Sequence, residues 1–496
     1  MTGSNLLVDV KLSNGKTIQV QTGLFINNEF VVGDYTLDTV NPATGEVITA
    51  VQAADTPKVD EAVDAAENAY QTVWKDTLPT ERQRLMLRLA DLIERDAEEL
   101  AQIETLDNGK PFTNSKFVDV PALLGTLRYY AGFADKLYGK LINTQVGTSL
   151  VDREPYGVCA GILPWNFPLS MLGWKLGPAL VTGNVIIIKT SEITPLSALK
   201  VAALAKEAGF APGVIQIITG YGKTAGTALS RHMRVSKLAF TGSTMVGREI
   251  MKASADTNLK KVTLELGGKS PNIIFNDADI DQAVKFAHRG IYYNQGQICC
   301  AGSRIYVQEG VYDQFVKGLQ AAATTGKSGD PFDLTTMHGP LVSQMQFDRV
   351  MDYIESGKAE GAHVHTGGKR VGDKGYFIEP TIFTDVKPEM KIVKEEIFGP
   401  VAVVTKFKDE DDVVRLANDT VYGLASAVFT KDIDRALTVA KRIQAGTVWV
   451  NGYNLLENET PFGGYGQSGI GRENGEMGLD NYLQYKTIKI NLNVKL

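Results

Sequence analysis

The stretch NVIIIKT, residues 184–190, decides the fold class of this chain. Its four consecutive β-branched apolar residues between polar ends are typical of a short strand that is buried on both faces. A helical pattern over 195–209 follows and stops at Gly209. The alternation continues with strand patterns over 214–219, 237–240 and 261–266, and helical patterns over 223–230 and after Gly247. This order predicts an α/β fold with a parallel sheet covered by helices.

The alternation then starts again, which predicts a second α/β unit. Strand patterns cover 272–275, 304–308, 401–407, 424–430 and 447–451, and helical patterns cover 279–294, 410–418 and 432–444. Gly267-Gly268 is the expected boundary, because paired glycines allow a sharp hinge. Two amphipathic helices are expected before the first sheet, over 58–75 and 79–107. Asp55 or Thr56 is the expected cap of the first, with Pro57 in its first turn.

Two segments fit neither unit. Residues 137–155 read as a two-stranded arm, and residues 485–496 alternate through Ile488, Ile490, Leu492, Val494 and Leu496. An exposed alternating strand pairs readily with another strand edge. We interpret both segments as contacts between subunits; the alternative is an ordinary edge strand within one subunit.

Composition narrows the class of protein. The 496 residues exceed one ordinary core, and 44% hydrophobic with 22% charged residues is usual for a soluble globular protein. The net charge of -6 disfavours nucleic-acid and anionic-membrane partners. No segment is apolar for long enough to span a membrane. Three cysteines without a secretory signal predict a cytoplasmic protein.

Two of the three cysteines are adjacent, at Cys299-Cys300 within NQGQICCAGSR, residues 294–304. A small, flexible surround of this kind suits a thiol that a substrate must reach, and predicts thiolate chemistry. The five histidines show no metal-ligand spacing with cysteine or carboxylate, so no metal site is expected. Nothing marks one histidine as the partner of a Cys–His hydrolase, although spacing does not exclude that class.

Three polar residues stand in unusual surroundings, and each has a plain structural alternative. Glu265 ends an apolar strand, where burial would raise its pKa toward that of a general base; a structural ion pair explains it equally well. Asn166, in WNFP at 165–168, is placed to donate to an oxyanion or is a turn residue. Glu396 and Phe398, in KEEIFGP at 394–400, suit sugar hydroxyls and a ring, or form a charged turn.

Glycine-rich turns offer two places for an anion. The turn GSTMVG, residues 242–247, lies between a strand and a helix, so that its backbone N–H groups and Ser243 can face a phosphate. The turn at 219–226 has one residue too many for the dinucleotide fingerprint. The ATP-binding loop pattern fails at Gly222, Gly268 and Gly326, because none has a glycine five residues earlier.

Seven motifs in one order resemble the NAD(P)-dependent aldehyde dehydrogenase superfamily, most closely its tetrameric, broad-specificity branch of cytosolic and mitochondrial type. They are PWNFP, KTSE, FTGST, LELGGKSPN, NQGQICCAGSR, EEIFGP and PFGGYGQSGIGRE, and the resemblance runs from about Gly23 to the C-terminus. It implies an NAD-binding domain of Rossmann type (1–136 and 156–267, with part of 469–482), an α/β catalytic domain (268–468) and a β oligomerisation arm (137–155 and 483–496). The implied assembly is a homotetramer, a dimer of dimers.

The resemblance also implies the chemistry. Cys299 attacks the aldehyde to give a thiohemiacetal, and the Asn166 amide and the Cys299 N–H stabilise its oxyanion. Hydride transfer to the nicotinamide leaves a thioester, which a water activated by Glu265 hydrolyses to the acid. Glu473 is implied in a proton relay. The activity corresponds to an NAD-dependent aldehyde dehydrogenase of class EC 1.2.1.-, similar to 1.2.1.3.

The implied cofactor contacts divide by part of the dinucleotide. Glu396 holds the nicotinamide ribose beside Phe398, Lys189 and Glu192 reach the adenosine ribose, Ser243 contacts the pyrophosphate, and Gln346 and Arg349 lie near the other end. The full implied set is Leu163, Pro164, Trp165, Asn166, Lys189, Thr190, Ser191, Glu192, Gly222, Lys223, Gly242, Ser243, Gly247, Glu265, Leu266, Gly267, Gln346, Arg349, Glu396 and Phe398. A carboxylate at Glu192 that accepts from a ribose hydroxyl repels a 2′-phosphate, which favours NAD over NADP.

The implied aldehyde tunnel is apolar, which favours an aliphatic or aromatic aldehyde, from acetaldehyde to an aryl or indole acetaldehyde. Its walls are Phe167, Met171, Trp174, Ile298, Leu456 and Phe462. Ile298 and Leu456 differ from the residues of some relatives and leave the tunnel width open. Three alternatives remain beside this interpretation: a cysteine-dependent esterase or amidase, an NADP-preferring aldehyde dehydrogenase, and a structural protein on the same scaffold.

Overall fold

A parallel sheet with reversing strand order forms the first unit. The computed structural model describes residues 6–145 and 147–491. Five parallel strands lie in the order β13-β12-β9-β10-β11, so the chain fills one side of β9 and then the other. Antiparallel strands extend the sheet at both edges. The eight strands in spatial order are β23 (Gly469–Ile470), β13 (Lys261–Glu265), β12 (Lys237–Thr241), β9 (Val158–Ile162), β10 (Val185–Lys189), β11 (Ile215–Ile218), β3 (Leu24–Ile26) and β4 (Glu29–Val31).

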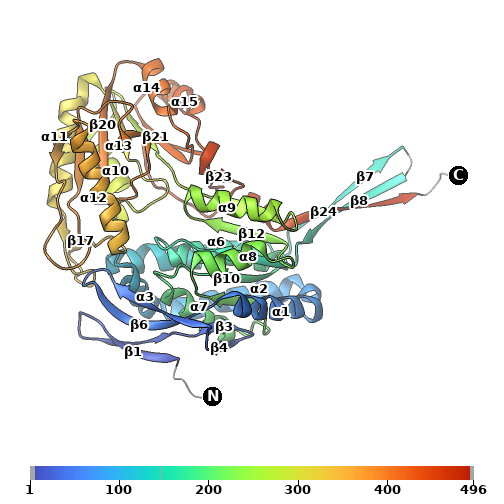
Figure 1. Cartoon of the computed structure of the whole chain (residues 1–496). Coiled ribbons are helices and arrows are strands. Elements are labelled where there is room, and N and C mark those ends of the chain that lie inside the picture. The colour runs from blue at the N-terminus through green and yellow to red at the C-terminus, as the bar shows by residue number, and fades with distance from the viewer. Residues whose placement is uncertain (1–5, 146, 492–496) are drawn as a thin grey trace.

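Helices pack around this sheet, in the lower half of Figure 1. They are α1 (Thr56–Thr72), α2 (Pro79–Arg95), α3 (Ala97–Asn108), α4 (Phe112–Asn114), α5 (Val120–Ala131), α6 (Pro168–Val181), α7 (Leu196–Ala208), α8 (Thr227–Arg231) and α9 (Thr244–Ala255). The side chain of Asp55 accepts from the N–H of Thr56, 2.7 Å away, and caps α1 as expected. Gly209, at φ 95°, ends α7 as expected, in a conformation that favours glycine.

The single helix expected over 79–107 is wrong. The chain forms α2 and α3, which are separated by Asp96 at φ -98° and ψ 19°. The Asp96 carboxylate binds Arg95 at 2.7 Å and Lys200 of α7 at 3.2 Å. The ion pair with Lys200 holds Asp96 against another helix, and apolar spacing alone does not reveal such a contact.

The second unit is a seven-stranded sheet at the upper left of Figure 1. All neighbouring strands are parallel except β18 and β19. In spatial order the strands are β18 (His363–Thr366), β19 (Thr381–Thr384), β20 (Val401–Phe407), β15 (Arg304–Gln308), β14 (Pro271–Ile274), β21 (Ala425–Phe429) and β22 (Thr447–Val450). Its helices are α10 (Ile280–Tyr292), α11 (Tyr312–Thr325), α12 (Gln344–Ala359), α13 (Lys391–Lys394), α14 (Glu410–Asn418) and α15 (Ile433–Arg442). The predicted α/β class is confirmed.

The carboxyl edge of the first sheet meets the amino edge of the second. Strand β13 of the first sheet ends at Glu265, and β14 of the second begins at Pro271. The loops that enter β15 and β20 carry the CC and EEIFGP motifs. A Cβ on Gly268 would lie 2.6 Å from the carbonyl oxygen of Cys299, so these loops are in contact. In doubly wound sheets, ligands bind at the carboxyl edge where the strand order reverses.

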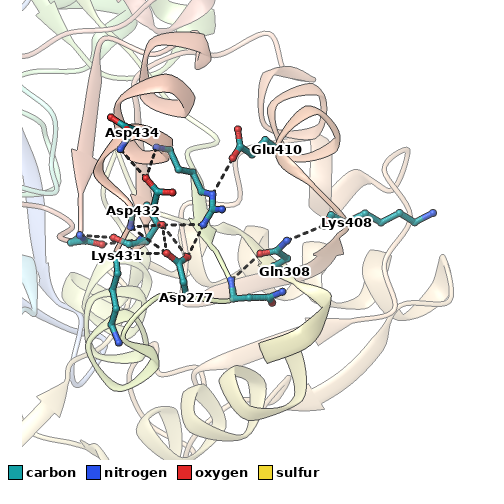
Figure 2. Close-up of polar contacts among 11 residues, drawn as sticks. Asp277, Gln308, Lys408, Glu410, Lys431, Asp432 and Asp434 are labelled. Carbon is teal, nitrogen blue, oxygen red and sulfur yellow. Dashed lines mark hydrogen bonds and ion pairs between the residues drawn. The ribbon is translucent and has the colours of Figure 1, made fainter.

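The opposite, carboxyl edge of the second sheet is closed by hydrogen bonds and ion pairs (Figure 2). Asp277, which follows β14, accepts from the Thr430 hydroxyl and from the N–H groups of Lys431 and Asp432. Its carboxylate also pairs with Arg435 of α15 at 3.0 Å. Asp432 caps α15 through the N–H groups of Asp434 and Arg435.

A three-stranded antiparallel sheet projects from the molecule, to the right in Figure 1. Strands β7 (Lys140–Thr144) and β8 (Gly147–Pro155) form the predicted arm, and β24 (Leu483–Asn491) pairs with β8. The C-terminal strand therefore has a partner edge in its own chain. Leu492, Val494 and Leu496 of the expected alternation lie outside the described residues. A role of the arm between subunits remains a prediction.

Short strand pairs complete the fold. They are β1 (Leu7–Lys11) with β2 (Thr17–Gln21), β5 (Tyr35–Asn41) with β6 (Glu46–Ala53), and β16 (Lys327–Ser328) with β17 (Thr336–His338). Across residues 6–145 and 147–491, no helix is both long and apolar enough to cross a membrane.

Candidate active site

The loop after β9 carries the predicted oxyanion donor. Asn166 is buried, and its Nδ2 donates to the carbonyl oxygen of Gln297 at 2.8 Å. Gln297 lies in the loop of the cysteine pair, 131 residues away in sequence. The neighbouring Trp165 ring stands perpendicular to that of Phe398, with centroids 5.2 Å apart. Three of the predicted segments therefore meet at the carboxyl edge of the first sheet.

The loop before the cysteines is held in a backbone conformation that L-residues rarely adopt. Asn294, Gln295 and Gly296 have φ of 47°, 56° and 70° in succession. A Cβ on Gly296 would lie 2.0 Å from the carbonyl oxygen of Gly399, which makes glycine necessary there. All three residues are buried. The expectation of a small, flexible surround is therefore corrected: close packing against the 396–399 loop fixes this backbone.

The two adjacent cysteines have different surroundings. Cys299 is partly exposed, whereas Cys300 is 1% exposed. The Cys300 thiol donates to Oδ1 of Asn454 at 3.0 Å, and its carbonyl accepts from the hydroxyl of Tyr453 at 2.7 Å. A hydrogen bond with Cys300 and burial raise the pKa of the Cys299 thiol well above its ordinary value. The reachable sulfur is therefore that of Cys299.

Glu265 is a buried carboxyl group without a hydrogen-bond partner. It is 4% exposed at the end of β13, and neither of its oxygens has a partner within the described part of the chain. Burial, the charge of Glu473 and the nearby Cys299 raise its pKa well above the ordinary value. None of the ion pairs among the described residues includes Glu265, so the structural ion-pair alternative is wrong. The group is available to take a proton.

The carboxylate of Glu396 lies directly on the paired glycines. Its Oε1 accepts from the N–H of Gly268 at 3.0 Å, and a Cβ on Gly267 would lie 2.1 Å from its Oε2. Burial raises the pKa of Glu396 to about 7. Helix α12 supports this loop from behind, because Gln346 donates to the Phe398 carbonyl at 2.8 Å and Arg349 to the Glu396 carbonyl at 2.9 Å.

The remaining predicted cofactor residues follow the other strands of the first sheet. Thr190, Ser191 and Glu192 follow β10, which ends at Lys189; Gly222 and Lys223 follow β11. Lys189 is buried, and its ammonium lies 3.5 Å from the Glu192 carboxylate. After β12, Gly242 and Ser243 lead into α9, where Ser243 caps the helix by accepting from the N–H of Val246. Leu266 packs against Gly247 of α9, where a Cβ would lie 2.8 Å from it.

The residues of the predicted aldehyde tunnel differ in their contacts and in their exposure. Trp174 of α6 and Phe462 are buried, with ring centroids 5.6 Å apart, and Met171 lies one turn before Trp174. Phe167 stacks on Tyr293 at 6.3 Å. Ile298 is buried beside the cysteines, whereas Leu456 is 47% exposed. The tunnel remains a prediction.

The sequence interpretation did not find Lys175. This lysine lies in the fully buried helix α6, and its Nζ binds Oε1 of Glu473 at 2.5 Å and the Thr241 hydroxyl at 2.8 Å. A lysine in an otherwise apolar helix was the available signal, since a buried charge needs a partner. Within residues 6–145 and 147–491, no three His, Cys, Asp or Glu side chains are grouped as a metal site would need.

Comparison with known proteins gives the family. The model of the aldehyde dehydrogenase family matches residues 30–488. The chain belongs to the aldehyde dehydrogenase family. It is 56% identical over 491 residues to an aldehyde dehydrogenase of Alternaria alternata, which covers 98% of this chain and 99% of the relative. It is 54% identical over 472 residues to the mitochondrial aldehyde dehydrogenase of Homo sapiens, covering 94% and 91%.

Solved structures of the aldehyde dehydrogenase family agree with this fold. An indole-3-acetaldehyde dehydrogenase of P. syringae, in complex with NAD+ and IAA, superposes with a TM-score of 0.94 at 41% identity. The match covers 96% of this chain and 97% of the other. The family resemblance drawn from the seven motifs is thereby confirmed, as is the fold that it implies.

Proposed function

We propose that this aldehyde dehydrogenase oxidises an aldehyde to a carboxylic acid with NAD and with Cys299 as the nucleophile. The observation that carries the proposal is the meeting of three groups at the carboxyl edge of the first sheet. A reachable thiol at Cys299, an amide donor at Asn166 and an unpartnered carboxyl at Glu265 are the nucleophile, oxyanion donor and base that such chemistry needs.

Each proton in the reaction has a donor and an acceptor. Cys299 is partly exposed, so its thiol passes its proton to solvent water as its sulfur bonds to the aldehyde carbon. The Asn166 amide and the Cys299 N–H stabilise the oxyanion of the resulting thiohemiacetal. Bound NAD supplies the hydride acceptor, and a thioester on Cys299 remains. Glu265 then takes a proton from water, which attacks the thioester and releases the acid.

The buried proton of Glu265 needs an exit. Glu473 raises the pKa of Glu265 and itself binds the ammonium of Lys175. Lys175 in turn binds the hydroxyl of Thr241 at the end of β12. We assign Glu473, with Lys175, to a proton relay behind the general base.

The residues at the sheet edge fit NAD. The N–H of Gly268 binds one carboxylate oxygen of Glu396 and leaves the other for ribose hydroxyls, and Phe398 packs edge-on against Trp165 at the same sheet edge. The Lys189–Glu192 pair follows β10 and supplies a donor and an acceptor to the adenosine ribose. The Glu192 carboxylate repels a 2′-phosphate, so NAD is preferred over NADP. Solved relatives of the family contain NAD+.

The proposed substrate is an apolar aldehyde, aliphatic or aromatic. Trp174, Phe462 and Ile298, which are predicted to line the aldehyde tunnel, are apolar and buried, and they offer no partner for a substrate charge. The P. syringae relative acts on indole-3-acetaldehyde by its name. The proposed activity is similar to EC 1.2.1.3.

The proposed assembly is a homotetramer that is built through the arm. Leu141 of β7 and Ile488 of β24 are apolar and exposed on it, and a second subunit would cover them. The proposed domains are those implied by the family resemblance, with an NAD-binding domain of residues 1–136 and 156–267 to which part of 469–482 returns. A cytoplasmic location remains a prediction from the sequence.

The deciding experiment follows NADH absorbance with NAD and a panel of aliphatic, aromatic and indolic aldehydes. We expect turnover with at least one apolar aldehyde and much weaker turnover with NADP. The absence of NADH with every aldehyde would refute the proposal. A thiol esterase, the second candidate class, would instead hydrolyse an activated ester at full rate without NAD.

A further inference from the structure

A buried ammonium lies directly behind the predicted oxyanion donor. Gly109, at φ 83°, ends α3, and the side chain of the next residue, Lys110, is fully buried. Its Nζ lies 2.5 Å from Oδ2 of Asp119 and 3.5 Å from Oε1 of Glu104. It also donates to the carbonyl oxygen of Asn166 at 2.9 Å. An ammonium has three N–H donors, so all three are used.

Two carboxyl groups fix the position of this ammonium. Glu104 and Asp119 are both fully buried, and Glu104 also accepts from the hydroxyl of Ser197 at 2.6 Å. A buried charge without partners is costly, so Lys110 stays between these acids rather than reorienting. The ammonium is therefore a fixed point in the core.

That fixed point holds the backbone of Asn166. The same carbonyl oxygen accepts from Nδ2 of Asn294 at 3.2 Å and from Nδ2 of Asn108 at 3.4 Å. Lys110 also lies 4.4 Å from the ring centre of Phe167, the next residue. With its carbonyl held, Asn166 extends its amide to Gln297 in the cysteine loop. The amide has a second N–H, which an oxyanion on Cys299 can accept.

We propose that Lys110 is a positioning residue for oxyanion stabilisation: it fixes the Asn166 backbone so that the amide faces the thiohemiacetal oxygen. Lys110 touches neither substrate nor cofactor in this role and acts only through Asn166. The inference rests on the proposed function, because it assumes that an oxyanion forms at Cys299. It predicts that loss of Lys110 slows both acylation and thioester hydrolysis, because both steps pass through an oxyanion on the carbon that is bonded to Cys299.

The test is Lys110→Met, measured in a single turnover with enzyme in excess over aldehyde. The rate of NADH formation should fall by about 10- to 100-fold, because a small misplacement of an oxyanion donor costs rates of this order. Thioester hydrolysis should also slow, because it forms an oxyanion on the same carbon, whereas the affinity for NAD should not change. Lys260→Met is the matched control, since Lys260 is also buried but binds Ser230 and Thr257 at the amino end of β13.

A double-mutant cycle separates positioning from a general packing defect. In an Asn166→Ala background, Lys110→Met should cause no further loss in the rate of NADH formation, because the side-chain amide that Lys110 positions is already absent. Additive losses, or an unchanged rate in the single variant, would overturn the inference. If Lys110→Met does not fold, the near-isosteric Asp119→Asn replaces it in the double-mutant cycle. The rate of NADH formation is then measured for Asp119→Asn alone and in the Asn166→Ala background, and it is judged in the same way. Failure of the proposed function is distinct, because the wild-type chain would then form no NADH.

Discussion

Two carboxyl groups at strand ends have opposite surroundings. Glu265, at the carboxyl edge of the first sheet, has no hydrogen-bond partner among the residues that the structure describes, and burial raises its pKa well above the ordinary value. Asp277 follows β14 at the carboxyl edge of the second sheet and has four donors. Although burial works in the other direction, hydrogen bonds from Thr430 and the charge of Arg435 lower the pKa of Asp277. We therefore expect Glu265 to take part in the reaction and Asp277 to stabilise the fold.

The largest effect is expected at the reactive edge, for Cys299→Ala. Loss of the nucleophile should reduce kcat by at least about 10⁴-fold, whereas Cys300→Ala should keep most of it. The reason is that Cys300 is buried and bonded to Asn454. Steady-state NADH formation for both variants measures the contrast. A dead Cys300→Ala beside an active Cys299→Ala would reverse the roles.

Glu265→Gln should separate the two halves of the reaction. Without the base, thioester hydrolysis should slow by about 10²- to 10⁴-fold, while the first burst of NADH remains. Mass spectrometry of the quenched enzyme should show the acyl group accumulating on Cys299. Asp277→Asn is the matched control and should leave both steps unchanged. Equal loss of burst and turnover in Glu265→Gln would contradict the assignment.

The pH dependence of hydrolysis should report Glu265. Because burial raises its pKa, the carboxyl group keeps its proton at low pH, and hydrolysis should rise about tenfold per pH unit until that pKa is passed. The folded chain holds this proton more tightly than the unfolded chain does. Its contribution to stability is therefore present below the ordinary glutamate pKa of 4.5 and is lost as the pH rises through the raised pKa of the folded chain.

Single-turnover hydrolysis between about pH 5 and 10 measures this limb. Glu265→Gln should lack it and should unfold at a temperature no lower than the wild type at neutral pH. A lower unfolding temperature would show that the ionised carboxylate stabilises the fold.

The smallest effect is expected at the closed edge. Asp277→Asn removes the charge that Arg435 and two backbone N–H groups face, and should lower the free energy of unfolding by about 1–2 kcal/mol. Urea unfolding followed by circular dichroism measures the loss. If Asp277→Asn leaves the free energy of unfolding unchanged but reduces turnover, Asp277 contributes to the reaction and not to the stability of the second sheet.

The sequence predicted those parts of the fold that rest on local patterns. The strands β10 to β13 and their helices were predicted because short, wholly buried apolar runs are separated by clear helix ends. The strands before α1 were not predicted; Leu24–Ile26 and Glu29–Val31, for example, are only three residues long, which is too short for a strand period to be recognised. The break at Asp96 depends on a charge partner in another helix.

For the site, the sequence motifs predicted the residue types that lie together. The buried residues that hold these side chains in place could not be predicted from the sequence. Lys175 and Glu473 are 298 residues apart, and the partners of Lys110 lie on three separate segments. Pairings of this kind are set by tertiary packing and leave no periodic pattern. The burial of the cysteine loop was missed for the same reason.

The close approach of Gly296 to Gly399 has a mechanical consequence. The backbone of the loop that carries the nucleophile lies against the backbone that follows Glu396 and Phe398, with no room for one methyl group between them. Because tightly packed atoms leave no free space, a displacement of the 396–399 backbone toward Gly296 would also displace the Cys299 loop. We therefore expect the positions of Glu396 and of the Cys299 thiol to change together.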